Sequence, residues 1–266
     1  MRVLINPWKT EFLELVSSSK KSIKITSPFV KDNICKEMLT VKNQSAKVVL
    51  ITSFKMMSVY AGALDINALE NLLDHDGIVR SYPKLHSKIY LFDNERAIIT
   101  SGNLTSGGME NNFEYGIYIS DREIVNNISN DFNFLMKNES TGIITKRKLE
   151  EVKRIIKNLR KSGVQNQLID SFDKENPEEA LDIIDNSIEP IKKSLSGWKL
   201  EVFKCLNLIP KDRFSLNDIN KFENDLQTIY PSNKHIKDKI RQQLQYLRDL
   251  GLIEFLGSGK YRKLWK

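Results

Sequence analysis

The stretch LHSKIYLFDNERAIITSGNLTSGGMENNFEYG, residues 85–116, is the most informative part of this chain. Short runs of apolar and β-forming residues at 89–92, 96–100 and 115–119 predict three strands. Asp93-Asn94 lies between the first two runs and predicts a tight turn. The stretch is therefore expected to place three strands side by side, with loops that carry polar residues at their ends.

Polar side chains gather at the ends of these predicted strands. His86 and Lys88 are expected to lie in the first strand and to point the same way, because alternate side chains of a strand share a face. Ser101 and Asn103 follow the second strand in a Gly-rich loop, where N–H groups and short polar side chains can bind an anion. Glu114 precedes the third strand. This set of groups suits attack on a phosphodiester without a metal ion.

The spacing of these residues resembles the signature of the phospholipase D superfamily, H-x-K-x4-D followed by a Ser and an Asn. The chain has His86-Ser87-Lys88, four residues to Asp93, and then Thr100-Ser101-Gly102-Asn103. Glu114 falls where single-copy nucleases of that superfamily carry a carboxylate. Thr100 replaces the usual small residue. The resemblance implies an α/β domain with a mixed sheet flanked by helices.

The resemblance also implies roles for these residues. His86 is expected to be the nucleophile that forms a phosphohistidine, and a second His86 the general acid and then the base. Lys88 and Asn103 would stabilise the phosphorane charge with help from Ser101, and Glu114 would hold the other imidazole nitrogen. Because the chain has one H-x-K copy, a homodimer must build each site. No metal ion or small-molecule cofactor is implied.

The rest of residues 1–140 is expected to complete this catalytic domain. The alternation of strands and helices by itself predicts an α/β domain with a mostly parallel sheet. Further strands are predicted at residues 2–5, 22–29, 46–54 and 78–82. Helices are predicted at residues 8–16, 31–39, 64–73 and 122–136.

Composition narrows the class of protein. Of the 266 residues, 40% are apolar and 28% are charged, which is typical of globular domains. No apolar run approaches the ~20 residues that span a bilayer, and the N-terminus lacks the layout of a signal peptide. Cys35 and Cys205 stand far apart without a metal-binding motif. We expect a cytoplasmic protein that does not bind membranes.

Residues 141–195 predict a helical linker. Apolar residues recur at helical spacing over 146–160, opposite a heavily charged face. The segment 170–185 that follows is polar and acidic. The apolar stripe is compatible with contacts in a dimer or with packing on its own domain, and the sequence leaves both open.

Residues 196–266 differ in charge from the rest of the chain. They hold 14 lysines and arginines against 8 acidic residues, which accounts for nearly all of the formal net charge of +7. Such a basic module points to a polyanion partner. Helices are predicted at 198–208, 215–229 (with a capping box of Ser215 and Asp218) and 234–250 (capped by Asn233 and ended by Gly251), and a β-hairpin at 252–265. This order is that of a winged helix.

The third of these helices and the hairpin carry the expected DNA contacts. Ile236, Ile240, Leu244 and Leu247 form an inward stripe, which leaves basic and amide residues free for phosphates and base edges. The predicted DNA-binding residues are Lys234, Lys237, Lys239, Arg241, Gln242, Gln245, Lys260, Arg262 and Lys263. Residues 236–257 also resemble the winged-helix module of methyl-directed (Dam-replacing-type) restriction endonucleases.

Together these features predict a metal-independent restriction-type endonuclease that acts on double-stranded DNA. It would be a homodimer with an α/β catalytic half and a winged-helix reader. A phospholipase D-type nuclease of DNA repair or defence is one alternative. A DNA-binding regulator with a silent catalytic domain is another, although the complete set of predicted catalytic residues argues against it.

Overall fold

The computed structural model describes residues 1–162 and 188–265. The chain divides into two compact units. The first comprises Met1–Phe54 and Gly62–Lys146, and the second comprises Lys55–Ala61 and Arg147–Lys266. The acidic segment 170–185 of the predicted linker lies outside the described residues.

An eight-stranded sheet in the order β1-β7-β6-β5-β2-β3-β4-β8 forms the first unit. The strands are β1 (Arg2–Ile5), β2 (Ser22–Thr26), β3 (Lys47–Thr52), β4 (Ile78–Ser81), β5 (Ile89–Phe92), β6 (Arg96–Thr100), β7 (Tyr115–Ile119) and β8 (Gly142–Ile144). Among them β2–β3 and β3–β4 are parallel, and the other neighbours are antiparallel. The sheet is therefore mixed, as the family resemblance implied. The expectation of a mostly parallel sheet is wrong, because β5, β6 and β7 are joined by connections without a crossover helix.

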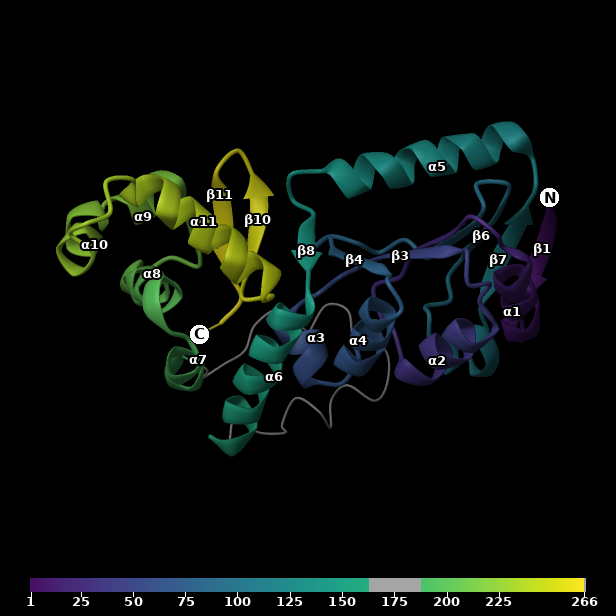
Figure 1. The fold of residues 1–266 in the computed structure, drawn as a ribbon, viewed down its shortest axis with the longest axis horizontal. Helices are drawn as coiled ribbons and strands as arrows, with labels where there is room; N and C mark the ends of the chain where they lie inside the picture. Colours follow the sequence, from purple (N-terminus) through teal and green to yellow (C-terminus); the bar gives the residue numbers. More distant parts are fainter. Residues whose placement is uncertain (163–187, 266) are drawn as a thin grey trace. The chain divides into compact units, whose positions relative to one another are not determined.

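Helices cover both faces of this sheet. The helices α1 (Lys9–Ser18), α2 (Asp32–Val41) and α4 (Ile66–Asp74) lie on one side, and α5 (Arg122–Lys137) lies on the other (Figure 1). The side chain of Asp121 caps α5 by accepting from the backbone N–H groups of Glu123 and Ile124, each at 3.0 Å. The last strand, β8, pairs with β4 beyond residue 140, so this unit extends past the predicted boundary.

The turn between β5 and β6 has the predicted conformation. Asp93 and Asn94 have φ angles of 55° and 58°, and two left-handed residues in succession make the hairpin turn that suits twisted strands. The Asp93 carboxylate accepts from the backbone N–H groups of Lys20, Lys21 and Ser22 at 2.8, 2.7 and 2.8 Å. Partial burial raises the pKa of Asp93, but these three N–H groups outweigh it and hold the pKa below its ordinary value. Asp93 thus has a structural role at the start of β2.

We expect Asp93→Asn to lower the free energy of unfolding by about 1–3 kcal/mol, because an amide NH₂ then faces three backbone donors. The folded-state pKa is depressed, so the stabilisation is complete above the ordinary pKa of an aspartate and is lost as pH falls through the lower folded-state pKa. Urea unfolding at pH 7 and pH 3 measures both effects. Glu95→Gln is the control, since Glu95 forms an exposed ion pair with Lys21 and should change stability little. Equal losses in the two variants would contradict this role.

The second unit has the element order of a winged helix. Its helices are α3 (Met56–Tyr60), α6 (Lys146–Lys161), α7 (Ile188–Ser194), α8 (Gly197–Leu208), α9 (Leu216–Asn220), α10 (Glu223–Ile229) and α11 (Ile236–Asp249). Its strands β9 (Arg213–Ser215), β10 (Ile253–Gly257) and β11 (Lys260–Lys263) form a sheet in the order β10-β11-β9. The predicted hairpin is present. The three-residue β9 was not predicted, because so short a run has no periodicity of its own.

Two predicted helix boundaries differ from the structure. The capping box of Ser215 and Asp218 is present, but α9 ends at Asn220, and a turn separates it from α10. Asn233 does not cap α11. Its Oδ1 atom accepts from the backbone N–H of His235 at 2.8 Å and supports the turn that precedes the helix.

The interior face and the end of α11 are as predicted. Ile236, Ile240, Leu244 and Leu247 are all buried. Gly251 has φ of 73°, its N–H donates to Arg248 O at 2.8 Å, and the N–H of Leu252 donates to Leu247 O at 3.0 Å. This pair of bonds is the glycine-terminated helix end that the sequence predicted.

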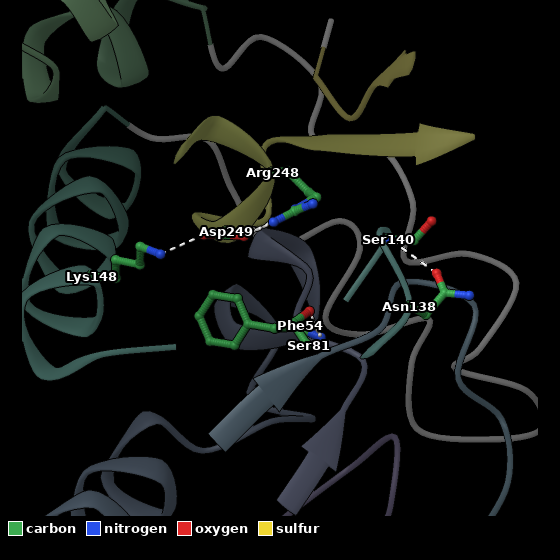
Figure 2. A network of polar contacts seen from close by, with 7 residues as sticks. All are labelled: Phe54, Ser81, Asn138, Ser140, Lys148, Arg248 and Asp249. Carbon is green, nitrogen blue, oxygen red and sulfur yellow. Dashed lines mark hydrogen bonds and ion pairs between the residues drawn. The ribbon is translucent and has the colours of Figure 1, made fainter. Parts of the chain in front are cut away.

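Helix α6 belongs to the second unit through a buried apolar face and charged contacts. Its stripe is buried along the helix. Figure 2 shows the Asp249 carboxylate between Lys148 and Arg248, and Arg248 Nη2 lies 2.8 Å from Asp249 Oδ1. Glu151 is 2% exposed and accepts from Lys199 and from the Tyr246 hydroxyl. Of the two alternatives that the sequence left open, the apolar stripe therefore packs on its own chain. Any contact of α6 in a dimer would involve its charged face.

Candidate active site and nucleic-acid interface

His86 and Lys88 meet just before β5. The structure places residues 86–88 in extended chain ahead of the strand, so the expectation that the strand includes them is wrong. Their side chains nevertheless approach, with Lys88 Nζ 3.3 Å from His86 Nε2. An ammonium group can only donate, so Nε2 is the acceptor when this contact is a hydrogen bond. His86 is exposed, whereas Lys88 is only 7% exposed, so an exposed imidazole lies beside an almost buried cation.

Ser101 and Glu114 form a second pair at the adjoining ends of β6 and β7. The Ser101 hydroxyl donates to Glu114 Oε2 and accepts from the backbone N–H of Tyr115 at 3.1 Å. Asn112 Nδ2 lies 3.3 Å from the other carboxylate oxygen of Glu114. The predicted contact of Glu114 with the imidazole stays a prediction.

Asn103 is held through its amide oxygen and lines a pocket. Its Oδ1 atom lies 3.3 Å from both the Ser27 hydroxyl and the backbone N–H of Phe29, which donate to it. The amide nitrogen is then the end that is oriented for a further acceptor. The pocket has a volume of about 450 Å³ and is lined by Phe29, Lys31, Asn33, Ala63, Asn103, Thr105, Ser106 and Gly107.

Backbone contacts connect the predicted residues. The N–H of Thr100 donates to Lys88 O at 3.1 Å, which joins the segment of His86 to the end of β6. The Thr100 hydroxyl accepts from the N–H of Gly102 and donates to Tyr115 O. Thr100, which replaces the usual small residue of the motif, therefore stabilises the start of the loop. The structure thus brings the predicted catalytic residues to neighbouring ends of β5, β6 and β7.

The loop that carries Asn103 is held by residues that were not predicted. A Cβ atom on Gly102 would lie 2.2 Å from Gly108 O, so two glycine backbones pack directly on each other. The buried Tyr90 hydroxyl donates to Gly102 O and the Trp8 indole to Gly108 O, each at 3.0 Å. Burial raises the pKa of Tyr90 well above its usual value, which keeps this donor protonated. No local pattern marks Trp8 and Tyr90, because their partners are distant in sequence.

Most of the residues predicted to contact DNA lie on the surface of the second unit. The exposed ones are Lys234, Lys237, Arg241, Gln242, Gln245 and Lys260. Lys239 is partly buried and donates to Gln242 Oε1 at 2.7 Å, and Arg262 is paired with Glu254 at 2.8 Å. Lys263 requires a correction. It is 7% exposed, its Nζ donates to Ile209 O at 2.8 Å, and burial lowers its pKa, so it stabilises the end of α8 rather than facing DNA.

An aromatic pocket precedes α11. The rings of Trp198 and Tyr230 stack with centroids 3.9 Å apart and planes at 15°. They line a pocket of about 510 Å³ together with Ser232, Asn233, Lys234 and His235. The sequence did not indicate this stack, because Trp198 on α8 and Tyr230 after α10 have no motif in common.

Two kinds of feature are absent from the described residues. Within residues 1–162 and 188–265, no group of three or more His, Cys, Asp or Glu side chains is placed to hold a metal ion. No helix in the part of the chain that the structure describes is long and apolar enough to cross a membrane.

Three solved structures have partial likeness to this chain. Nuc from Salmonella typhimurium is 18% identical, with a TM-score of 0.43 over 50% of this chain and 90% of its own. NucT from Helicobacter pylori is 16% identical, with a TM-score of 0.39 over 51% of this chain and 94% of its own. The phosphatidylserine synthase of Haemophilus influenzae is 17% identical, with a TM-score of 0.44 over 62% of this chain and 44% of its own.

Two family models match separate parts of this chain. Residues 12–136 match the family described as "Cardiolipin synthase, PLD-like domain", where PLD denotes phospholipase D. Residues 194–263 match the family described as "Dam-replacing HTH domain", a helix-turn-helix domain. Both resemblances drawn from the sequence are confirmed. The chain carries a phospholipase D-like domain followed by a Dam-replacing helix-turn-helix domain.

Proposed function

We propose that this protein is a restriction-type DNA endonuclease that cleaves phosphodiester bonds through a covalent phosphohistidine. The observation that carries the proposal is the contact of Lys88 Nζ with His86 Nε2 in a phospholipase D-like domain, on a chain that also has a Dam-replacing helix-turn-helix domain. The first feature supports phosphoryl chemistry, and the second supports DNA as the substrate.

The proposed reaction has two steps. In the first, His86 Nε2 attacks phosphorus, the bond from phosphorus to the leaving nucleotide oxygen breaks, and the protonated imidazole (imidazolium) of His86 of the partner subunit gives that oxygen a proton. In the second, a water molecule attacks the phosphohistidine while the same partner imidazole takes its proton. The phosphorus–nitrogen bond then breaks, and the nucleophile is free again.

Neighbouring groups would act on charge and orientation. The Lys88 ammonium and the Asn103 amide nitrogen are donors for the phosphorane oxygens, which gain negative charge in the transition state. The Ser101 hydroxyl donates to the Glu114 carboxylate. We therefore assign two roles to Ser101, which are to position Glu114 and to help stabilise the negative charge of the phosphorane. Glu114 would in turn fix the imidazole tautomer in which Nε2 is the acceptor.

We expect DNA cleavage to persist in EDTA. The candidate site offers imidazole, ammonium and amide groups, which can supply the nucleophile and the charge stabilisation that a metal ion otherwise provides. Plasmid digestion in EDTA, compared with digestion in Mg²⁺, measures this. Activity that vanishes in EDTA and returns with Mg²⁺ would refute the mechanism.

The same digestion separates the alternative functions. Discrete fragments indicate a restriction-type enzyme, a smear indicates a nuclease without site preference, and intact plasmid indicates a DNA-binding regulator. Plasmids with and without adenine methylation, followed by sequencing of the ends, test how far the Dam-replacing domain directs the choice of site.

We expect Arg241→Ala and Lys260→Ala to weaken DNA binding and its salt dependence. Both side chains are exposed, and each phosphate contact contributes about 0.9 to the slope of log K against log salt concentration. Binding titrations from low to moderate salt measure the slope. Lys204→Ala is the control, because the side chain of Lys204 is 43% exposed in the second unit but pairs with Glu201 on α8. Unchanged affinity after deletion of 196–266 would show that this domain is not the reader.

A further inference from the structure

The pocket that Asn103 lines extends away from the other predicted catalytic residues. Apart from Ala63, its lining residues come from two segments of the first unit, residues 29–33 after β2 and residues 103–107 after β6. Its volume of about 450 Å³ lies within the range of about 300–1,000 Å³ that is usual for sites of small ligands. The pocket can therefore hold a group of the substrate beside the phosphate.

Hydrogen bonds join the two segments at successive positions. They run from Phe29 N to Asn103 Oδ1 at 3.3 Å, from Lys31 N to Leu104 O at 3.0 Å, and from Asn33 Nδ2 to Ser106 Oγ at 2.6 Å. Two walls that are tied together in this way keep their spacing without a ligand. The pocket is therefore preformed, which lowers the entropic cost of binding.

The pocket carries no net positive charge. Of its lining residues, Lys31 is the charged one. The Lys31 ammonium donates to Gly62 O, and its Nζ atom lies 3.3 Å from Asp65 Oδ1. A second phosphate of DNA is bound best by a cation that has no carboxylate beside it. The lining therefore favours an uncharged group of the substrate over a further phosphate.

The other lining residues offer apolar surface and hydrogen-bonding groups. Phe29 is partly buried, and Ala63 adds to the apolar surface. Amide and hydroxyl groups come from Asn33, Thr105 and Ser106. A nucleobase combines a flat face, which stacks well on an aromatic ring, with a polar edge that forms hydrogen bonds. The lining thus matches a nucleobase in both respects.

We propose that this pocket binds the base of a nucleotide next to the scissile phosphate, stacked on Phe29 and outside the DNA helix. The inference rests on the proposed nuclease function, in which the Asn103 amide contacts the phosphorane. The nucleosides on both sides of a phosphodiester are bonded directly to it, so one of them lies within reach of the pocket. Within a duplex the neighbouring bases cover both faces of each base, so a base that stacks on Phe29 must leave the helix.

The fluorescence of 2-aminopurine tests the position of the base. The cleavable duplex carries this adenine analogue at one or the other nucleotide that flanks the cut, and the His86→Ala protein binds it without cutting. Stacking in DNA quenches the analogue, so we expect a several-fold rise in emission on binding at one of the two positions. Adding Phe29→Ala, which removes the ring, or Ala63→Trp, which fills the pocket, should abolish the rise.

Cleavage kinetics test the stack itself. In the active protein, Phe29→Ala should raise KM for the duplex by about 10-fold, as the loss of one contact between a base and an aromatic ring does. It should change kcat by less than about twofold, because the stack is present before and during the reaction. A duplex with an abasic nucleotide at the same position should remove the difference between the variant and the unaltered protein. A purely structural role of Phe29 would leave that difference in place.

Phe134→Ala is the matched control. Phe134 is 72% exposed on α5 and does not line the pocket, so this variant should keep both the rise in emission and the unaltered KM. Thermal melts show whether each variant is folded, and Ala63→Trp tests the pocket without removing a side chain that packs.

The outcomes separate this inference from the proposed function. If the unaltered protein cuts DNA but emission rises at neither position, or if folded Phe29→Ala and Ala63→Trp variants keep the rise, the base pocket is overturned and the nuclease stands. An unaltered protein that cuts no DNA overturns the proposed function and this inference with it. A rise that both pocket variants abolish and Phe134→Ala preserves supports the pocket.

Discussion

His86→Ala is expected to lower the rate of DNA cleavage by about 10³-fold or more, as removal of a nucleophile does in other enzymes. The variant lacks the imidazole whose Nε2 atom lies beside Lys88 Nζ. Without it, neither the phosphohistidine nor the proton transfers can occur. DNA binding should survive, because the predicted contacts lie in the second unit. Cleavage of supercoiled plasmid and a binding titration on the same preparation measure the two properties.

His75→Ala is the matched control for this variant. His75 is also an exposed histidine of the first unit, but its Nδ1 atom lies 2.8 Å from Asn71 O at the end of α4. Its replacement should leave cleavage within about twofold of normal, as surface substitutions change stability little. Near-normal cutting by the His86 variant, or equal losses in both variants, would end the assignment of His86 as the nucleophile.

The second large effect concerns mixed dimers. A dimer with one unaltered subunit and one His86→Ala subunit is expected to lose about 10²-fold or more of its activity, because nucleophile and general acid act on the same phosphodiester. Two tags allow this species to be isolated, and its cleavage rate is compared with that of the doubly unaltered dimer. One site per dimer also predicts a nicked plasmid intermediate, since the two strands are cut in turn.

A mixed dimer with a His75→Ala subunit controls for the tags and for subunit exchange. It should cut at the unaltered rate. If instead the His86→Ala mixed dimer keeps half of the activity, each chain holds a complete site of its own. That result would leave a phospholipase D-like nuclease in place but would remove the second histidine from its mechanism.

Local patterns determined a large part of this protein. The run from Ile89 to Phe92, the turn at Asp93 and the spacing of His86 and Lys88 predicted the strands and the family, and the family match confirms the latter. The apolar stripe of α11 and the glycine after it were equally clear. Such features depend on the period of a strand or helix and on the conformations that single residues allow, so a few neighbours suffice to predict them.

The roles of single residues within those patterns could not be predicted from the sequence and became clear only in the folded structure. Asp93 belongs to the motif that predicted the family, yet the structure places its carboxylate on three backbone N–H groups of β2 and the residues before it. The neighbours of Lys263 in the sequence are those expected for an exposed residue of the wing, but its side chain is buried against the end of α8. A sequence shows that a side chain is charged, whereas its partner is set by a segment about 50 to 70 positions away.

Only the tertiary structure decided how the strands are ordered and which surfaces stay open. Insertion of β2 between β5 and β3 makes the sheet mixed, and the path of α5 covers Leu91 but leaves Ile117 exposed. The stacked glycines at Gly102 and Gly108 likewise depend on Trp8 and Tyr90. Alternating patterns give each strand two possible faces, and long-range packing selects which face is buried, because contacts distant in sequence outweigh the local preferences of each strand.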